Sequence, residues 1–188
     1  MSPRDDETWR LFVAVPLDEE ARSAAAASGS LLLARLSDAA WRWVDRLDLH
    51  LTLAFLGSVS PSAVADLAER LGEVARESHS MTLACGGLGA FPSARDARVL
   101  WYGVDDPAGE LRSLAARVRS AVGLPEDAPF RGHITLARVR ASRNADVRRT
   151  LLIPVPGSRL HVRSVVLQRS SMDARPSRYK ALERWRLP

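Results

Sequence analysis

The chain has 188 residues, of which 46% are hydrophobic, and this content is typical of one globular domain rather than a disordered chain. Its apolar stretches are too short and interrupted for a membrane span, and the charged first seven residues predict no secretory signal. The single cysteine, Cys85, can form no internal disulfide and fits a cytoplasmic location, and the net charge of +5, almost wholly from arginine, permits a phosphate-bearing partner.

The first half of the sequence predicts three strands and two helices. Pro16 ends the first strand, and acidic residues at the start of the first helix favour the helix dipole. Ser60 and Pro61 supply an N-cap and a first turn for the second helix. In chain order, the expected elements are a strand over 11–15, a helix over 18–35, a strand over 41–44, a strand over 50–57 and a helix over 60–77.

The second half predicts strands separated by glycine- and proline-containing segments. Asp106 and Pro107 start a helix, and a later run rich in proline and acidic residues indicates a loop. The expected elements are a strand over 81–85, a flexible glycine segment over 86–89, a strand over 98–104, a helix over 108–122, a loop over 124–128, a strand over 133–139, a short helix over 145–152, and strands over 162–168 and 179–187.

One short pattern occurs twice, as His-Leu-Thr-Leu-Ala at 50–54 and as His-Ile-Thr-Leu-Ala at 133–137. Alternation of polar and apolar residues is typical of a half-buried strand, and side chains two residues apart share a face of it. Each histidine should therefore point the same way as the threonine that follows it, with the apolar residues in a core. The candidate site residues are His50, Thr52, His133 and Thr135.

The two halves share a similar order of strands and helices around these motifs. This order indicates a duplication with pseudo-twofold symmetry, with approximate repeats at 10–95 and 96–188, because such symmetry brings two identical motifs face to face. No linker separates the repeats. We therefore expect residues 1–188 to form a single α+β unit with a cleft.

Two histidines can act as a general base and a general acid at one pH if their pKa values differ. Such a pair suits displacement at phosphorus, where one imidazole takes a proton from water and the other protonates the departing oxygen. Threonine hydroxyls can donate hydrogen bonds to the non-bridging oxygens. A 2′,3′-cyclic phosphate is a natural substrate, because its strained ring lets acid/base catalysis suffice without a metal.

Other chemistries find less support in the sequence. The motifs bring no acidic residue or cysteine for a zinc site, so we expect no metal. There is no Gly-x-Ser-x-Gly elbow and no phosphate-binding Gly-Lys-Ser/Thr loop, and Cys85 lies in an apolar strand. A non-catalytic protein that binds RNA ends or nucleotides remains the alternative from a different class.

The paired motifs resemble those of the 2H phosphoesterase superfamily, specifically the RNA 2′,3′-cyclic phosphodiesterases, also called 2′-5′ RNA ligases. The similarity runs nearly end to end. The matching segments are residues 10–16 as the opening strand, 48–57 and 130–138 as the two signatures, and 89–92 with 98–101 as a central hairpin.

The resemblance implies a bilobal α+β fold in which two antiparallel-rich sheets line a V-shaped central groove and helices lie on the outside. It also implies metal-independent hydrolysis of a 2′,3′-cyclic phosphate to a 2′-phosphomonoester, with no cofactor. By similarity, His50 would be the proton donor and His133 the proton acceptor, while Thr52 and Thr135 would bind the phosphate. The implied partner is RNA with a cyclic phosphate end, or a cyclic nucleotide, and a monomer would suffice.

The same resemblance suggests roles for further residues. Phe91 lies where the family places an aromatic residue that stacks on the base, with a loop-anchoring core role as the alternative. Arg138 matches an arginine near the phosphate, but strict alternation turns it toward the core, so it needs a bulge or a strand end to reach the site. Tyr179 fits a late tyrosine of the family or a packing role. Gly132 replaces the proline that the family commonly has, which should loosen the approach to His133.

Several alternatives stay open at this stage. Within the same class, the substrate could be a 2′-5′ RNA linkage or ADP-ribose 1″,2″-cyclic phosphate, and the reaction in the cell could be ligation rather than hydrolysis. The sequence alone does not assign which histidine is the acid. His79 and His161 lie outside both motifs, and we interpret them as surface or structural residues.

Overall fold

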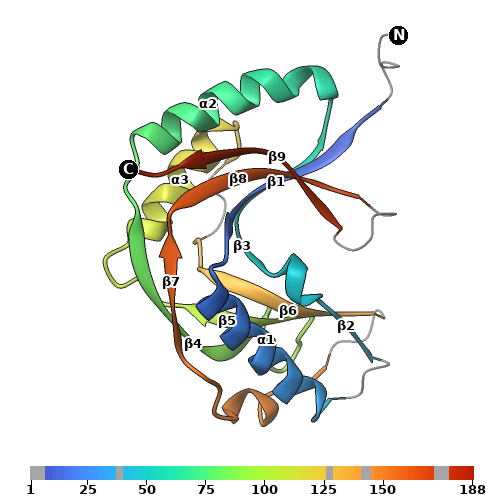
Figure 1. Cartoon of the computed structure of the whole chain (residues 1–188). Helices are drawn as coiled ribbons and strands as arrows, with labels where there is room; N and C mark the ends of the chain where they lie inside the picture. The colour runs from blue at the N-terminus through green and yellow to red at the C-terminus, as the bar shows by residue number, and fades with distance from the viewer. Residues whose placement is uncertain (1–6, 37–39, 126–128, 141–144, 172–177) are drawn as a thin grey trace.

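A computed structural model describes residues 7–36, 40–125, 129–140, 145–171 and 178–188 (Figure 1). The described elements are mostly strands, with three α-helices among them. With η denoting a 3₁₀ helix, they are β1 (Trp9–Pro16), α1 (Glu19–Leu33), β2 (Trp41–Trp43), η2 (Arg46–Asp48), β3 (His50–Val59), η3 (Pro61–Ala63), α2 (Val64–Arg76), β4 (Met81–Phe91), β5 (Val99–Val104), α3 (Glu110–Ala121), β6 (His133–Val139), η4 (Thr150–Leu152), β7 (Ser158–Val162), β8 (Ser164–Ser170) and β9 (Tyr179–Arg186). None of the helices in these ranges is long and apolar enough to cross a membrane.

The strands form one antiparallel network in the order β7-β4-β5-β6-β3-β1-β8-β9, with β2 paired to β6. This arrangement confirms the α+β class. The family resemblance implied two sheets, whereas the described residues form one sheet of nine strands. Its two groups of four strands are joined between β3 and β6 by one residue pair, Leu51 with Ile134. The two signature strands therefore meet at the centre of the network.

The strands of the two halves of the chain interleave. β4 comes from the first half and pairs with β5 of the second, while β8 comes from the second half and pairs with β1 of the first. Figure 1 shows β1, β8 and β9 across the upper part of the molecule and β4, β5 and β6 across the lower part. Each group of strands thus contains segments from both 10–95 and 96–188, and their origin by duplication stays a prediction.

The helices cover the apolar face of the strands. α1 contacts β6 and β7, α3 contacts β3, and α2 contacts α3, β8 and β9. The Asp18 side chain caps α1 by accepting a hydrogen bond from the Ala21 backbone N–H. In α3 the buried residues recur with the period of a helix, so that one stripe faces the core. Leu51 and Ile134 are fully buried in this core, and the residues beside them point to the other face.

Three predicted elements differ from the structure. Residues 86–89 were expected to be flexible but belong to β4, because they pair with β5. The indole of Trp101 lies across Gly89, where an added Cβ would come within 2.0 Å of the ring. The predicted helix over 145–152 is wrong, since only η4 forms there. Ala145 pairs through its backbone with Ala97, which fixes it in an extended bridge. The single strand predicted over 162–168 is two strands, β7 and β8.

Candidate active site

The pair Leu51–Ile134 places both motifs on one face of the network. Because these two residues point into the core, the neighbouring His50, Thr52 and the corresponding residues of β6 point to the opposite face. An antiparallel register continued one step from this pair would set His50 level with Thr135 and Thr52 level with His133, although the two strands share only the one pair. The charge of His133 also lowers the pKa of His50, so the two imidazoles lie near each other on this face, and each threonine lies on the same side of its strand as its histidine.

Both signature strands carry a β-bulge at the same place in the motif. On β3, Leu53 is the extra residue between Ala54 and Thr52, which pair with consecutive residues of β1. On β6, Leu136 is the extra residue in the same way against β5. A bulge changes the phase of alternation, so the residue three positions after each threonine returns to the face of the site.

Arg138 reaches the site because of this bulge. Its side chain is exposed, whereas Leu136 and Ala137 before it are buried. Its charge lowers the pKa of both His50 and His133, so the guanidinium lies close to both imidazoles. The bulge that the sequence required for Arg138 is thus present. The equivalent position on β3 holds an exposed phenylalanine, so the two strands differ in charge at this point.

Each imidazole is held in one orientation by its own strand. Nδ1 of His50 lies 2.7 Å from the backbone oxygen of Asp48, and Nδ1 of His133 lies 2.8 Å from that of Arg131. A carbonyl oxygen only accepts, so Nδ1 carries the hydrogen in both rings and donates it. This assignment leaves Nε2 of each ring as the basic nitrogen on the side away from its own backbone.

Aromatic rings pack against both histidines. Phe12 and Tyr179 lie 4.9 and 5.0 Å from the centroid of His50, with Tyr179 edge-on. Phe91 lies 5.0 Å from His133 and Trp101 6.3 Å from it. Phe91 is therefore beside the predicted base and half-buried, and it also packs on Trp101 at 5.4 Å. This position fits both interpretations of Phe91, as a packing residue and as an aromatic ring on which a base could stack.

Burial is the main cause that lowers the pKa of His50 below its ordinary value of 6.5, and the charge of Arg138 lowers it further. The hydrogen bond to the backbone of Asp48 opposes this shift. Burial lowers the pKa of His133 in the same way, with Arg138 and Arg131 adding to it. Because both pKa values are lowered, both rings favour the neutral form near pH 7 in the absence of an anion.

The two histidines outside the motifs have no part in this cluster. His161 lies on β7, where its Nδ1 is 3.0 Å from Oγ1 of Thr82 and its backbone N–H donates to Asp18. His79 is exposed after α2. Across the described ranges, no three histidine, cysteine or acidic side chains come together as a metal-binding group.

The sequence did not single out Phe12, Trp101 or Asp48 as parts of the site. Phe12 and Trp101 lie in short apolar strands, where a continuous apolar run does not reveal which side chains turn toward the site. Asp48 acts through its backbone carbonyl, which no residue type reveals. The spacing did carry a signal for it, because Arg131 precedes His133 by the same two residues and makes the same contact.

Gly132 is closely packed rather than loose. It is buried, and a Cβ added there would lie 2.8 Å from Cδ2 of Leu111 in α3 and 3.3 Å from the Val104 side chain. The glycine thus lets α3 approach the start of β6, and the expectation that it loosens this segment is wrong.

Replacing Gly132 with alanine should destabilise the protein by about 1–3 kcal/mol, because Leu111 is fully buried and must shift. Thermal or urea unfolding measures this change. Gly86→Ala is the matched control, since an added Cβ meets nothing within 4 Å there. Equal stability of the two variants would contradict the packing explanation.

Comparison with known proteins identifies the family of the chain. The chain matches the family described as LigT like Phosphoesterase over residues 15–101 and 103–176. It is 35% identical over 163 residues to the RNA 2′,3′-cyclic phosphodiesterase of Aeropyrum pernix, covering 80% of this chain and 92% of that protein. It is 36% identical over 176 residues to the protein of the same name from Geobacillus stearothermophilus, where 88% of this chain spans 53% of the relative.

Solved structures give the same result. The crystal structure of Escherichia coli LigT in apo form superposes with a TM-score of 0.74 at 33% identity, covering 97% of this chain and 99% of that one. The structure of the same protein complexed with 3′-AMP gives a TM-score of 0.74 at 30% identity, with coverage of 96% and 99%. These matches confirm the resemblance drawn from the two motifs: the chain belongs to the LigT-like family of 2H phosphoesterases.

Proposed function

We propose that this protein is an RNA 2′,3′-cyclic phosphodiesterase that opens a terminal 2′,3′-cyclic phosphate to a 2′-phosphomonoester with two histidines and no metal. The observation that carries the proposal is the meeting of two His-x-Thr strands at one residue pair, with Arg138 close to both imidazoles. The names of the relatives support the substrate class. The complex of E. coli LigT with 3′-AMP shows that a relative binds a nucleotide.

In this reaction Nε2 of His133 takes a proton from a water molecule as its oxygen attacks phosphorus. The bond between phosphorus and O3′ breaks, and the imidazolium of His50 gives its proton to O3′. The product keeps the phosphate on O2′, and the two histidines end in exchanged protonation states. Solvent restores them before the next turnover.

The remaining side chains stabilise charge on the phosphoryl oxygens. Thr52 and Thr135 can each donate a hydroxyl hydrogen, and Arg138 adds a full positive charge. The neutral form that burial favours at His133 suits a base. An anionic substrate beside His50 raises the pKa of that ring relative to the free protein, which favours the protonated form that an acid needs. The division of roles follows the family resemblance, since the two strands present the histidines alike.

Incubation with a 2′,3′-cyclic mononucleotide in the presence of a chelator should give the 2′-monophosphate and no 3′-monophosphate. Chromatography against both standards measures the product. Binding of the nucleotide without turnover would identify a binding protein instead. Turnover that the chelator abolishes would contradict the metal-independent mechanism.

A further inference from the structure

A polar cavity adjoins His50, the histidine of the first motif. It has a volume of about 170 Å³, well above the roughly 15 Å³ that one water needs. Its polar lining comes from five different elements or segments of the chain. The polar lining residues are Arg22, Asp48, His50, Gln168, Tyr179 and Arg184. His50 is therefore a wall shared between the reaction site and this cavity.

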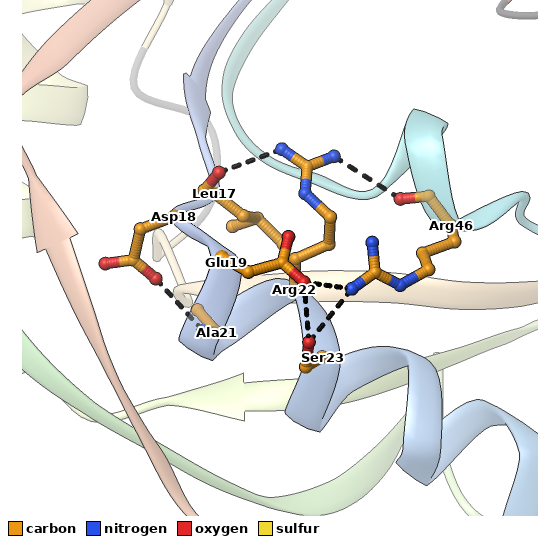
Figure 2. Close-up of polar contacts among 7 residues, drawn as sticks. All are labelled: Leu17, Asp18, Glu19, Ala21, Arg22, Ser23 and Arg46. Carbon is orange, nitrogen blue, oxygen red and sulfur yellow. Dashed lines mark hydrogen bonds and ion pairs between the residues drawn. The ribbon is translucent and has the colours of Figure 1, made fainter.

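Arg22 is held in place at the edge of the cavity. Its guanidinium donates to the backbone oxygen of Leu17 at 2.9 Å and to that of Arg46 at 3.4 Å, so it connects the start of α1 to η2 (Figure 2). A guanidinium has five N–H donors, and these two contacts do not exhaust it. Figure 2 also shows Arg46 bound to Glu19 and Ser23 of α1, which fixes η2 from its other side. One positive charge is thus already oriented before any ligand arrives.

The second positive charge comes from β9. Arg184 pairs with Val166 of β8, and Val166 lies opposite Ala14 of β1, which lies opposite Thr52. Residues paired directly across neighbouring strands share a face, so Arg184 projects on the same face as the His-x-Thr motif. It is exposed and can adjust to a ligand. Gln168 follows Val166 by two residues on β8, so it shares this face and lies nearer to Tyr179.

The one carboxylate among these lining residues is buried and held by the backbone, although its charge still acts on His50 and Tyr179. Asp48 is 5% exposed, and its two oxygens accept from the backbone N–H of Arg178 at 3.2 and 3.4 Å. Two guanidinium groups, an amide and a phenol therefore dominate the side of the cavity open to a ligand. This combination fits a phosphate, which accepts several hydrogen bonds and carries a negative charge.

We propose that this cavity binds the phosphodiester that links the terminal nucleotide to the one before it, so that the enzyme prefers RNA ends to cyclic mononucleotides. The inference rests on the proposed function. A cyclic phosphate held between the two histidines leaves its own ribose beside one of them. Because His50 protonates O3′ in the proposed reaction, the ribose lies on the side of His50. The preceding phosphate of the strand then enters the neighbouring cavity, between Arg22 and Arg184.

The test compares a cyclic mononucleotide with a dinucleotide that ends in a 2′,3′-cyclic phosphate. Arg184→Gln should lower kcat/KM for the dinucleotide about tenfold, through KM, because a charge-assisted contact to phosphate is lost. Turnover of the mononucleotide should not change. Arg186→Gln is the control, since Arg186 lies on the same face of β9, two residues farther on, and does not line the cavity.

A dinucleotide with a neutral methylphosphonate linkage provides the complementary change in the ligand. The wild-type protein should use it about tenfold less well than the natural dinucleotide, and Arg184→Gln should use both alike. Equal use of the charged and neutral linkages by the wild type would overturn the proposal. So would an equal loss on mononucleotide and dinucleotide in Arg184→Gln.

Failure of the proposed function is recognised separately, by absence of turnover of any cyclic substrate in the wild type. In that case, calorimetry measures the affinity of the protein for a dinucleotide 3′-phosphate and for a 3′-mononucleotide, which tests the subsite without turnover. Weaker binding of the dinucleotide alone in Arg184→Gln supports the subsite. Unchanged binding of the dinucleotide rejects it.

Discussion

Replacing His50 or His133 with alanine is expected to slow hydrolysis of a 2′,3′-cyclic nucleotide by roughly 10²–10⁴-fold, the usual effect of removing a general acid or base. Both imidazoles are fixed by a hydrogen bond from Nδ1 to a backbone oxygen, so each presents Nε2 to the site in one orientation. Single-turnover kinetics with saturating enzyme measures the chemical step apart from binding. His79→Ala is the control, because this exposed residue lies outside the site.

The two variants should differ with a substrate whose leaving group needs no proton. A nucleoside phosphodiester of p-nitrophenol releases a stable anion, so the loss of an acid matters less than the loss of a base. His50→Ala should regain much of its rate on this substrate, and His133→Ala should not. The opposite result would reverse the assigned roles. An effect of either variant no larger than that of His79→Ala would remove the histidines from the mechanism.

Arg138→Gln should reduce kcat/KM by roughly 10²-fold, because a preorganised donor to the phosphoryl oxygens is lost. The variant should also move the pH profile. Arg138 lowers the pKa of both His50 and His133, so its removal raises both values. On the acidic limb, the base His133 then becomes protonated at a higher pH. On the basic limb, the acid His50 keeps its proton to a higher pH. The whole bell-shaped pH profile of kcat/KM should therefore shift to higher pH.

The matched control for this variant is Arg42→Gln on β2. Arg42 lies directly opposite Arg138 across the strand pair and is exposed, but its charge is not among the causes of either histidine shift. It should leave the profile in place. A loss of rate in Arg138→Gln without a shift would show that this arginine binds substrate without acting on the histidines.

The central part of the site was predictable from the sequence because strand periodicity is a local property. The His-x-Thr spacing placed each histidine and threonine on one face, and the burial of Leu51 and Ile134 confirms that face. Alternation also indicated that Arg138 needs an irregularity to reach the site. The position of that irregularity, at Leu136, depends on the pairing with β5, which the sequence alone does not specify.

The features that the sequence analysis missed depend on contacts between distant segments. The glycines of β4 suggested flexibility, but Gly89 accommodates the indole of Trp101 from the next strand. The segment after β6 has helix-forming residues near Val147, and yet Ala145 is drawn into a bridge with Ala97. Arg184 lies in a strand that was predicted, but its position beside Arg22 follows from the order of β1, β8 and β9.

The exchange of strands between the two halves of the chain has a consequence for how the protein folds. β4 completes the sheet around β5, and β8 with β9 completes the sheet around β1, so neither half encloses a core without the other. Proteolytic cleavage near residue 95 should therefore release no autonomous fragment, and chemical denaturation should proceed as a single cooperative transition. Many of the stabilising contacts join segments far apart in sequence, a topology that slows folding compared with a protein assembled from successive hairpins.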